Sequence, residues 1–297
     1  MTDSASTPSK AKPRNTKRRN LIQRLGYTGL ILAAIITVTP IILIVVYIYS
    51  RGLPAISLEF LTAMPKDGMR AGGIFPAIVG TFWLTIGTGV IAVPLGVGAA
   101  IYLSEYAPDN RWTRTIRIAI INLAGIPSVV YGLFGLGLFV LFLHFGTSIL
   151  AGSLTLAIMT IPVIISTSEE ALRAVPNSFR VVSISVGGTR WQTIRRVVLP
   201  QALPGILTGV ILGLERAAGE TAPILFTGAA FFLPQLPNSP LDATMALPYH
   251  LYVISTQVPG MPLDVQYGVA LVLLALVLGM NLVATIIRSR FRRRRQW

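Results

Sequence analysis

Cysteine is absent from the 297 residues of this chain, and charged residues are few. Without cysteine the chain can form neither a disulfide nor a thiolate metal site. The sequence also lacks a Gly-Lys pair, which excludes a P-loop for ATP. Its two histidines, His144 and His250, are far apart in the sequence and near no other candidate ligands. We therefore expect neither a metal nor a cofactor in this chain.

Charged residues make up 12% of the sequence and hydrophobic residues 53%, with a mean hydropathy of +0.69. A soluble domain carries about 25% charged residues, so half of the usual polar surface is missing. Uncharged runs of ~20 residues or more are long enough to cross a bilayer as helices. This composition predicts an all-α integral membrane protein.

Six membrane-spanning helices account for the uncharged runs. The predicted spans are 25–50, about 76–100 with a bend near Pro94, two helices within 118–168 separated by a turn at 144–148, one from near Pro204 to near Thr227, and 265–287. The predicted domain order is a basic tail at 1–24, the membrane domain at 25–287 and a second basic tail at 288–297.

The net charge of +14 raises the question of a nucleic-acid partner. The basic residues flank apolar spans and lack a base-stacking aromatic array, so anionic lipid headgroups explain them better than nucleic acid. With both termini in the cytoplasm, 21 of the 25 basic residues lie on the cytoplasmic side. An odd number of spans would place one basic tail outside. A transit peptide is an alternative interpretation of the acid-poor first 20 residues.

Two loops carry further information. The cytoplasmic loop 167–203 is predicted to form two short helices: Pro176 begins the first, Gly187-Gly188 ends it, and Thr189 and Gln192 form a capping box for the second. Leu199-Pro200 is predicted to end that second helix. Such an element can dock into a groove of a partner or lie at the membrane interface. The proline-rich external loop 230–266 is predicted to contain an interfacial helix at 249–256.

The fifth predicted helix combines small residues with charge. Gly205, Gly209, Gly213 and Ala217 recur every four residues, a pattern that permits close helix packing. Arg216 lies twelve residues after Pro204, which predicts a position ~18 Å deep, near the bilayer midplane. A charge there costs at least ~2.5–3.5 kcal/mol. Arg216 and Glu220 are spaced to pair, whereas Glu215 points elsewhere and needs another partner. The pair is either structural or part of a substrate pathway.

Part of the loop 167–203 resembles the coupling loop of ABC importer permeases, in which Glu-Ala-Ala, three residues, Gly and nine residues precede Ile-x-Leu-Pro. Gly187 and the run Val197-Val198-Leu199-Pro200 match this pattern, whereas Val181-Val182-Ser183 stands in place of Glu-Ala-Ala. The resemblance implies that Gly187, Gly188, Val197, Leu199 and Pro200 couple this chain to an ATPase subunit.

The run from Arg216 to Thr227 resembles the R-A-A-G-E-T-A-P-x-L-F-T signature of the A-type permease of phosphate importers. The similarity extends from about residue 70 to 287. It implies a bacterial plasma-membrane subunit that is not itself an enzyme and that works with a second permease, two ATPase subunits and an extracytoplasmic phosphate-binding protein. It also implies that Arg216, Glu220, Glu215 and Thr221 line the phosphate pathway.

Three other functions remain open at this stage. A permease for another oxyanion, such as sulfate or molybdate, would use the same elements. A proton-coupled carrier could use the three charges as a relay, although such carriers usually show internal repeats and none is found here. A membrane scaffold without transport would leave the charges within the fifth helix unexplained.

Overall fold

The computed structural model describes residues 16–293, and the chain divides into two units at residue 50. The described part of the first unit is residues 16–50, which belong to α1 (Thr16–Gly52), a 37-residue helix with a strongly apolar stretch of mean hydropathy 2.8. Residues 16–24 of the predicted N-terminal tail therefore belong to a helix. Residues 1–15 and 294–297, the outer parts of the two predicted tails, lie outside the described residues.

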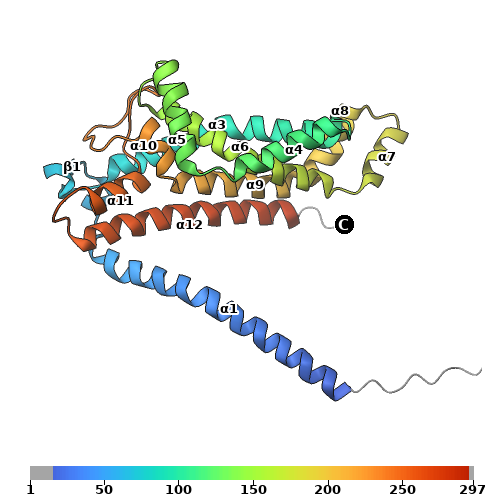
Figure 1. Cartoon of the computed structure of the whole chain (residues 1–297), viewed down its shortest axis with the longest axis horizontal. Coiled ribbons are helices and arrows are strands. Elements are labelled where there is room, and N and C mark those ends of the chain that lie inside the picture. The colour runs from blue at the N-terminus through green and yellow to red at the C-terminus, as the bar shows by residue number, and fades with distance from the viewer. Residues whose placement is uncertain (1–15, 294–297) are drawn as a thin grey trace, which may run out of the picture. The chain divides into compact units, whose positions relative to one another are not determined.

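The second unit is built on long helices that run side by side (Figure 1). These are α3 (Phe75–Ile101), α4 (Arg111–Ala124), α6 (Ile149–Arg173), α9 (Leu199–Gly219) and α12 (Leu263–Arg293). Within the described residues, five helices including α1 are long and apolar enough to cross a membrane, and a bent helix pair makes a possible sixth span. The expected all-α membrane fold is confirmed.

Shorter elements connect the spans. They are α2 (Leu58–Thr62), α5 (Ser128–Gly135), α7 (Asn177–Ser185), α8 (Arg190–Thr193), α10 (Ala222–Thr227) and α11 (Leu247–Thr256), with 3-10 turns at Leu53–Ala55 and Asp67–Met69 and π-helical turns at Tyr102–Tyr106, Leu136–Phe142 and Ile194–Val198. Strands β1 (Pro65–Lys66) and β2 (Ala71–Gly72) pair antiparallel, with Pro65 opposite Gly72.

Small residues bring the central helices together. α6 lies between α3 and α9, and Ala92, Ala157 and Ile164 at its two interfaces are fully buried. A side chain on Gly96 of α3 would come within 2.7 Å of Ile164. Because lipid tails are as apolar as leucine, close packing of this kind is a main source of attraction between helices in a membrane.

The third predicted span is not a straight helix. α4 and the helix of residues 128–142 form a pair bent by 98°. Gly125 ends α4, and Pro127, which has no amide hydrogen, precedes α5. In Figure 1, α5 accordingly points away from the helices that run side by side. The first of the two helices predicted within 118–168 is therefore a bent pair, which makes the sixth span if it is counted as one crossing.

The fifth predicted span has different ends from those expected. The chain is helical from Arg190 to Gly219, so Leu199-Pro200 does not end the second short helix. The π-helical turn at 194–198 precedes Pro200 and widens the helix where the proline ring would otherwise meet a carbonyl. The helix ends at Gly219 rather than near Thr227, because Pro223 cannot continue it and would clash with the Gly219 carbonyl.

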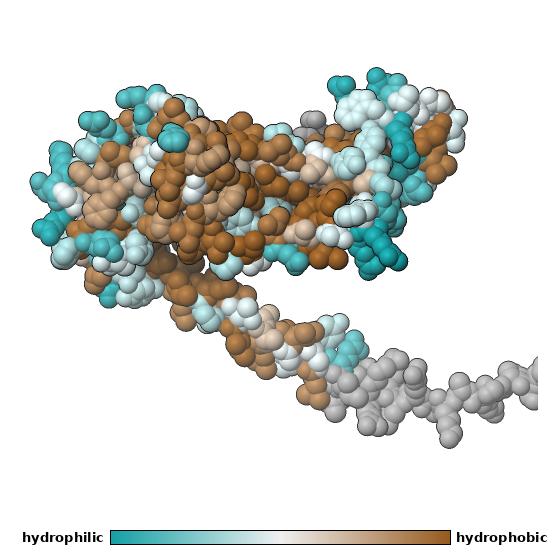
Figure 2. Space-filling view, turned by 45° about the horizontal axis from the view of Figure 1, so that its top comes forward, coloured by the Kyte–Doolittle hydropathy of each residue, from teal (hydrophilic) through white to brown (hydrophobic). Residues whose placement is uncertain are grey.

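The two ends of the second unit differ in content (Figure 1). α7, α8 and the C-terminal end of α12 lie at one end, whereas the β1–β2 hairpin and α11 lie at the other. The face drawn in Figure 2 is largely hydrophobic along the helices, and hydrophilic residues gather toward the two ends. The helix predicted at 249–256 is present as part of α11 (Leu247–Thr256). Its Leu247 and Val253 are buried in a core cluster that also contains Val269 of α12.

Candidate functional site

Arg216 lies in the last turn of α9, where a positive charge is favoured by the helix dipole. The continuous helix starts at Arg190, fourteen residues before Pro204, and the depth of Arg216 in the bilayer stays a prediction. The Nε of Arg216 donates to Oε1 of Glu220 at 3.3 Å, which is long for a charge-assisted bond. Among the described residues this is the only hydrogen bond of the Arg216 side chain. The side chain is 37% exposed, which leaves guanidinium donors available.

Glu220 and Thr221 form the break between α9 and α10. Glu220 has extended backbone (ψ 136°), and its side chain is 19% exposed. It lines a cavity of about 10 Å³ together with Thr81 and Thr85 of α3, a volume close to that of one water. Thr221 precedes α10 without capping it through its side chain. The positive charge of Arg216 also interacts electrostatically with the phenol of Tyr131, so α5 lies close to this break.

Glu215 faces away from Arg216 and finds a partner on another helix. Its Oε2 accepts a hydrogen bond of 3.0 Å from Nδ2 of Asn281 in α12. Its Oε1 is buried without a hydrogen-bond partner among the described residues. The structure therefore groups Arg216, Glu220 and Thr221 and places Glu215 at the α9–α12 contact.

The small-residue stripe of α9 packs against α6 in most of its length. A side chain on Gly205 would come within 2.5 Å of Ala171, and one on Gly213 within 2.7 Å of Thr160. A side chain on Gly209 would overlap Thr167. Ala217 continues the stripe into a core cluster with Leu84 of α3 and Ile224 of α10. This close contact fixes which face of α9 is left for Arg216.

The coupling loop (167–203) contains α7 as expected, whereas α8 continues through the π-helical turn into α9. Gly187 adopts φ +88°, a conformation that favours glycine, and a side chain there would meet nothing within 4 Å. A side chain on Gly188 would come within 2.7 Å of the Ser183 carbonyl. The capping box of Thr189 and Gln192 is present.

The later coupling-loop residues lie where the loop joins α9. Val197, Leu199 and Pro200 are partly buried, and Leu199 packs on the cluster around Val198. Hydrophobic side chains on the outer side of α7 and α8 remain exposed, namely Val181, Val182, Ile184, Val186 and Trp191. The apolar residues of the coupling loop are therefore divided between a side packed on the membrane domain and an exposed side.

Several ion pairs at the end of the molecule that carries α7 and α8 were not predicted from the sequence. Arg180 of α7 binds Glu105 at the end of α3 through two hydrogen bonds of 2.7 and 3.0 Å. Arg117 of α4 and Arg173 both contact Oε1 of Glu169, at 2.7 and 2.8 Å. Only Arg173 and Glu169, four residues apart on one helix, had a spacing that could indicate a pair.

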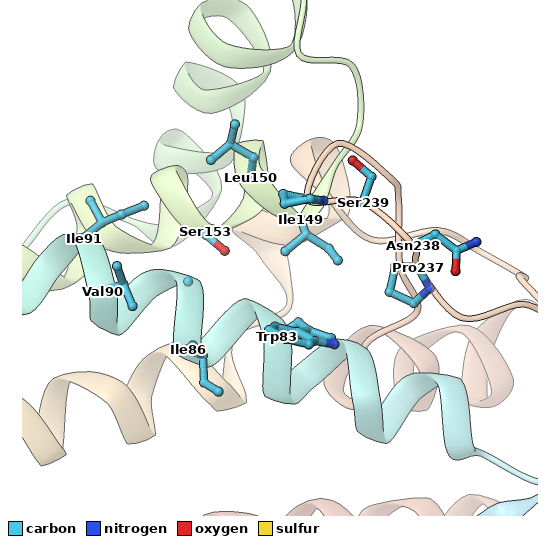
Figure 3. Close-up of a pocket in the computed structure, with 12 residues that line it drawn as sticks. Trp83, Ile86, Val90, Ile91, Ile149, Leu150, Ser153, Pro237, Asn238 and Ser239 are labelled. Atoms are coloured by element: carbon cyan, nitrogen blue, oxygen red, sulfur yellow. The ribbon is translucent and has the colours of Figure 1, made fainter.

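A hollow of about 430 Å³ lies between α3, α6 and the external loop (Figure 3). Trp83, Ile86, Val90 and Ile149 line it, with Ser153 among the few polar groups. Such walls cannot replace the hydration of an anion, so this hollow is no candidate for a charged substrate. Among the described residues, no group of three or more His, Cys, Asp or Glu could hold a metal ion.

Residues 92–297 match the model of the family described as binding-protein-dependent transport system inner membrane component. The chain belongs to this family. A probable ABC transporter permease, YqgI of Bacillus subtilis, is 36% identical over 253 residues, which are 80% of this chain and 85% of that protein. The phosphate transport system permease PstA 2 of Mycobacterium bovis is 33% identical over 293 residues, covering 97% of this chain and 95% of the relative.

Solved ABC transporters share the fold. The alginate transporter bound to its periplasmic protein superposes with a TM-score of 0.64 at 16% identity, covering 92% of this chain and 96% of that one. The inward-facing MetNI methionine transporter superposes with a TM-score of 0.59 at 18% identity, covering 73% of this chain and 97% of that one. At these identities the likeness concerns the fold alone.

Family membership confirms several of the expectations. The chain is an inner-membrane transport component of an ABC importer, not an enzyme by itself. It associates with ATPase and substrate-binding partners, as the family description implies. The alternatives of a proton-coupled carrier and of a scaffold are not favoured.

Proposed function

We propose that this chain is the permease subunit of an ATP-driven phosphate importer. The observation that carries the choice of substrate is Arg216, a partly exposed guanidinium held loosely by Glu220 in a membrane-spanning helix. Guanidinium donors match the oxygens of a tetrahedral oxyanion. Relatives named phosphate transport system permease, at 33% identity in Mycobacterium bovis and 35% in Xylella fastidiosa, support this choice.

Each residue of the site has a proposed role. Arg216 binds the anion as it passes the break after α9, and Glu220 holds the guanidinium in position while the site is empty. Thr221 adds a hydroxyl at the same break, and Glu215 keeps α9 against α12 through Asn281. Since the side chains of Arg216 and Glu220 carry opposite charges, the empty pair is close to neutral, which lowers the cost of keeping it in the membrane.

The partners follow from the same proposal. The exposed side of α7 and α8 docks on an ATPase subunit, two of which serve the complex. A second permease completes the pathway, and a phosphate-binding protein delivers substrate at the end that carries the hairpin and α11. The predicted division into a basic N-terminal tail (1–24), membrane domain (25–287) and basic C-terminal tail (288–297) belongs to this proposal as well.

Uptake of radiolabelled phosphate by three variants tests the role of Arg216. Arg216→Gln should reduce uptake to background while the complex still assembles. Glu220→Gln leaves the arginine charge without its partner and should lower both assembly and uptake. The double variant Arg216→Gln with Glu220→Gln has no stranded charge, and we expect it to assemble normally without transporting.

A purely structural ion pair makes the opposite prediction for the double variant, since removal of both charges would restore assembly and uptake together. A double variant that transports near the parental rate would therefore refute the role of Arg216. Competition by excess sulfate or molybdate, measured on the parental complex, identifies the anion. Uptake that either anion suppresses as well as unlabelled phosphate does would overturn the choice of phosphate.

A further inference from the structure

The first turn of α7 is tied to the rest of the molecule by a single arginine. The Nε and Nη2 of Arg180 donate to the two carboxylate oxygens of Glu105, at 3.0 and 2.7 Å. Its Nη1 donates to the carbonyl of Val175 at 2.7 Å, and Nη2 also donates to that of Leu172 at 2.9 Å. Four hydrogen bonds thus join α7 to α3 and to the end of α6.

This contact is well shielded for an ion pair at the end of a membrane domain. The side chains of Glu105 and Arg180 are 8% and 19% exposed. Two-point binding between a guanidinium and a carboxylate fixes distance and direction together. Leu172 lies in the last turn of α6, where helical carbonyls lack i+4 partners, and Val175 lies in the short segment between α6 and α7. Arg180 therefore supplies a donor to the Val175 carbonyl and adds one to the Leu172 carbonyl, which also accepts from the Val175 amide.

An apolar cluster extends the same connection. Leu103 of the α3 extension, Leu172, Val175 and Val198 are all buried in it, and Phe179 of α7 packs against it. On the other side of the loop, the hydroxyls of Ser183 and Thr193 lie 2.8 Å apart and join α7 to α8. The coupling loop thus contacts α3, α6 and α9 at the same time.

We propose that Glu105 and Arg180 are a positioning pair that transmits movement of the coupling loop to α3 and α6. This inference rests on the proposed function, in which an ATPase subunit moves α7. A force on the exposed side of α7 reaches α3 through the guanidinium–carboxylate contact and α6 through the two carbonyls.

The test compares Glu105→Gln, Arg180→Gln, the double variant, and the control Arg173→Gln. Arg173 lies at the same end of α6 and pairs with Glu169, yet its side chain is 55% exposed and its pair lies within one helix. Each complex is purified with its ATPase and binding protein. Assembly, basal ATP hydrolysis, hydrolysis stimulated by loaded binding protein, and phosphate uptake in vesicles are then measured.

The double variant separates positioning from stability. Because it strands no buried charge and removes donors only from the neutral carbonyls of Leu172 and Val175, it should assemble close to the parental level, as should the control. We expect its stimulated hydrolysis and uptake to fall at least about fivefold, the lower end of typical coupling between sites, while basal hydrolysis stays unchanged. The control should keep parental values. A double variant with parental stimulation and uptake would overturn the inference.

The result is distinguishable from failure of the proposed function. If the parental complex hydrolyses ATP in response to binding protein but takes up no phosphate, the choice of phosphate fails and the stimulated hydrolysis still tests the pair. If the parental complex shows no response to binding protein, the proposed function fails and the inference fails with it. A control that loses stimulation as strongly as the double variant would also overturn the special role of Glu105 and Arg180.

Discussion

At the scale of single residues, His250 shows how burial without a partner changes protonation. It belongs to α11, outside the membrane-spanning helices, and is 3% exposed. Its Nδ1 has no hydrogen-bond partner among the described residues. Burial lowers the pKa of His250 from 6.5 to about 4, because the imidazolium loses its hydration. The imidazole is therefore neutral in the folded protein at neutral pH.

This burial predicts a loss of stability in acid. The unfolded chain takes up the His250 proton near pH 6.5, whereas the folded chain does so only near pH 4, so stability falls as the pH drops between these values. At pH 5 the titration of His250 lowers the free energy of unfolding by about 2 kcal/mol relative to neutral pH. Unfolding of the purified protein at pH 7.5 and 5, for the parent and His250→Leu, measures it. Equal losses in both proteins would contradict the prediction.

The charged residues show what a sequence reveals at this scale. Pairing of Arg216 with Glu220 follows from their separation of four residues, and the structure contains that contact. The partner of Glu215 could not be predicted, since Asn281 is 66 residues away in another helix. The same holds for Glu105 and Arg180, which are 75 residues apart. Local spacing predicts local pairs, and only the packing of helices creates the others.

At the scale of elements, the turn between α7 and α8 depends on one left-handed glycine. Gly187 has φ +88° with open space around it, so a substitution there acts through backbone strain and not through a clash. We expect Gly187→Val, which is β-branched, to shift the angle between α7 and α8 and to lower stimulated ATP hydrolysis of the complex several-fold. Gly187→Asn should have a smaller effect, because asparagine tolerates this region.

Hydrolysis and assembly are measured together for these two variants. Normal assembly with reduced stimulation in Gly187→Val, and a milder change in Gly187→Asn, would support a coupling role for the turn. Parental stimulation in Gly187→Val would remove the turn from that role. Gly188→Ala is the matched steric variant, since its side chain would press on the Ser183 carbonyl at 2.7 Å.

The long helices show why spans are easier to predict than their breaks. Uncharged runs predict where the chain crosses the membrane, because a span must place about 20 mostly apolar residues in the hydrocarbon core. Pro200 and Pro204 both lie within helix, the first after a π-helical turn, whereas Gly125 with Pro127 and Glu220 with Pro223 lie at breaks. A proline alone does not determine the outcome. The neighbouring carbonyls and the packing of the next segment do so, and these are not visible in a single sequence.

At the scale of the whole molecule, the distribution of charge and the fold point to the same orientation. The coupling loop and the C-terminal end of α12 lie at one end of the second unit, and both carry clusters of arginine. The external loop, at the other end, has no lysine or arginine between 230 and 266. Since cytoplasmic loops of membrane proteins are enriched in lysine and arginine, the end with α7 and α8 is expected to face the cytoplasm.

Single cysteines test this orientation, and the native chain contains none, so background labelling from it is absent. Asn238 in the external loop and Ser185 at the end of α7 are both exposed, which makes them a matched pair. A membrane-impermeant thiol reagent should label Asn238→Cys in spheroplasts and leave Ser185→Cys unlabelled. After the membranes are opened, both should react, which controls for accessibility. Labelling of Ser185→Cys alone in intact spheroplasts would reverse the orientation and would place the proposed ATPase contact on the wrong side of the membrane.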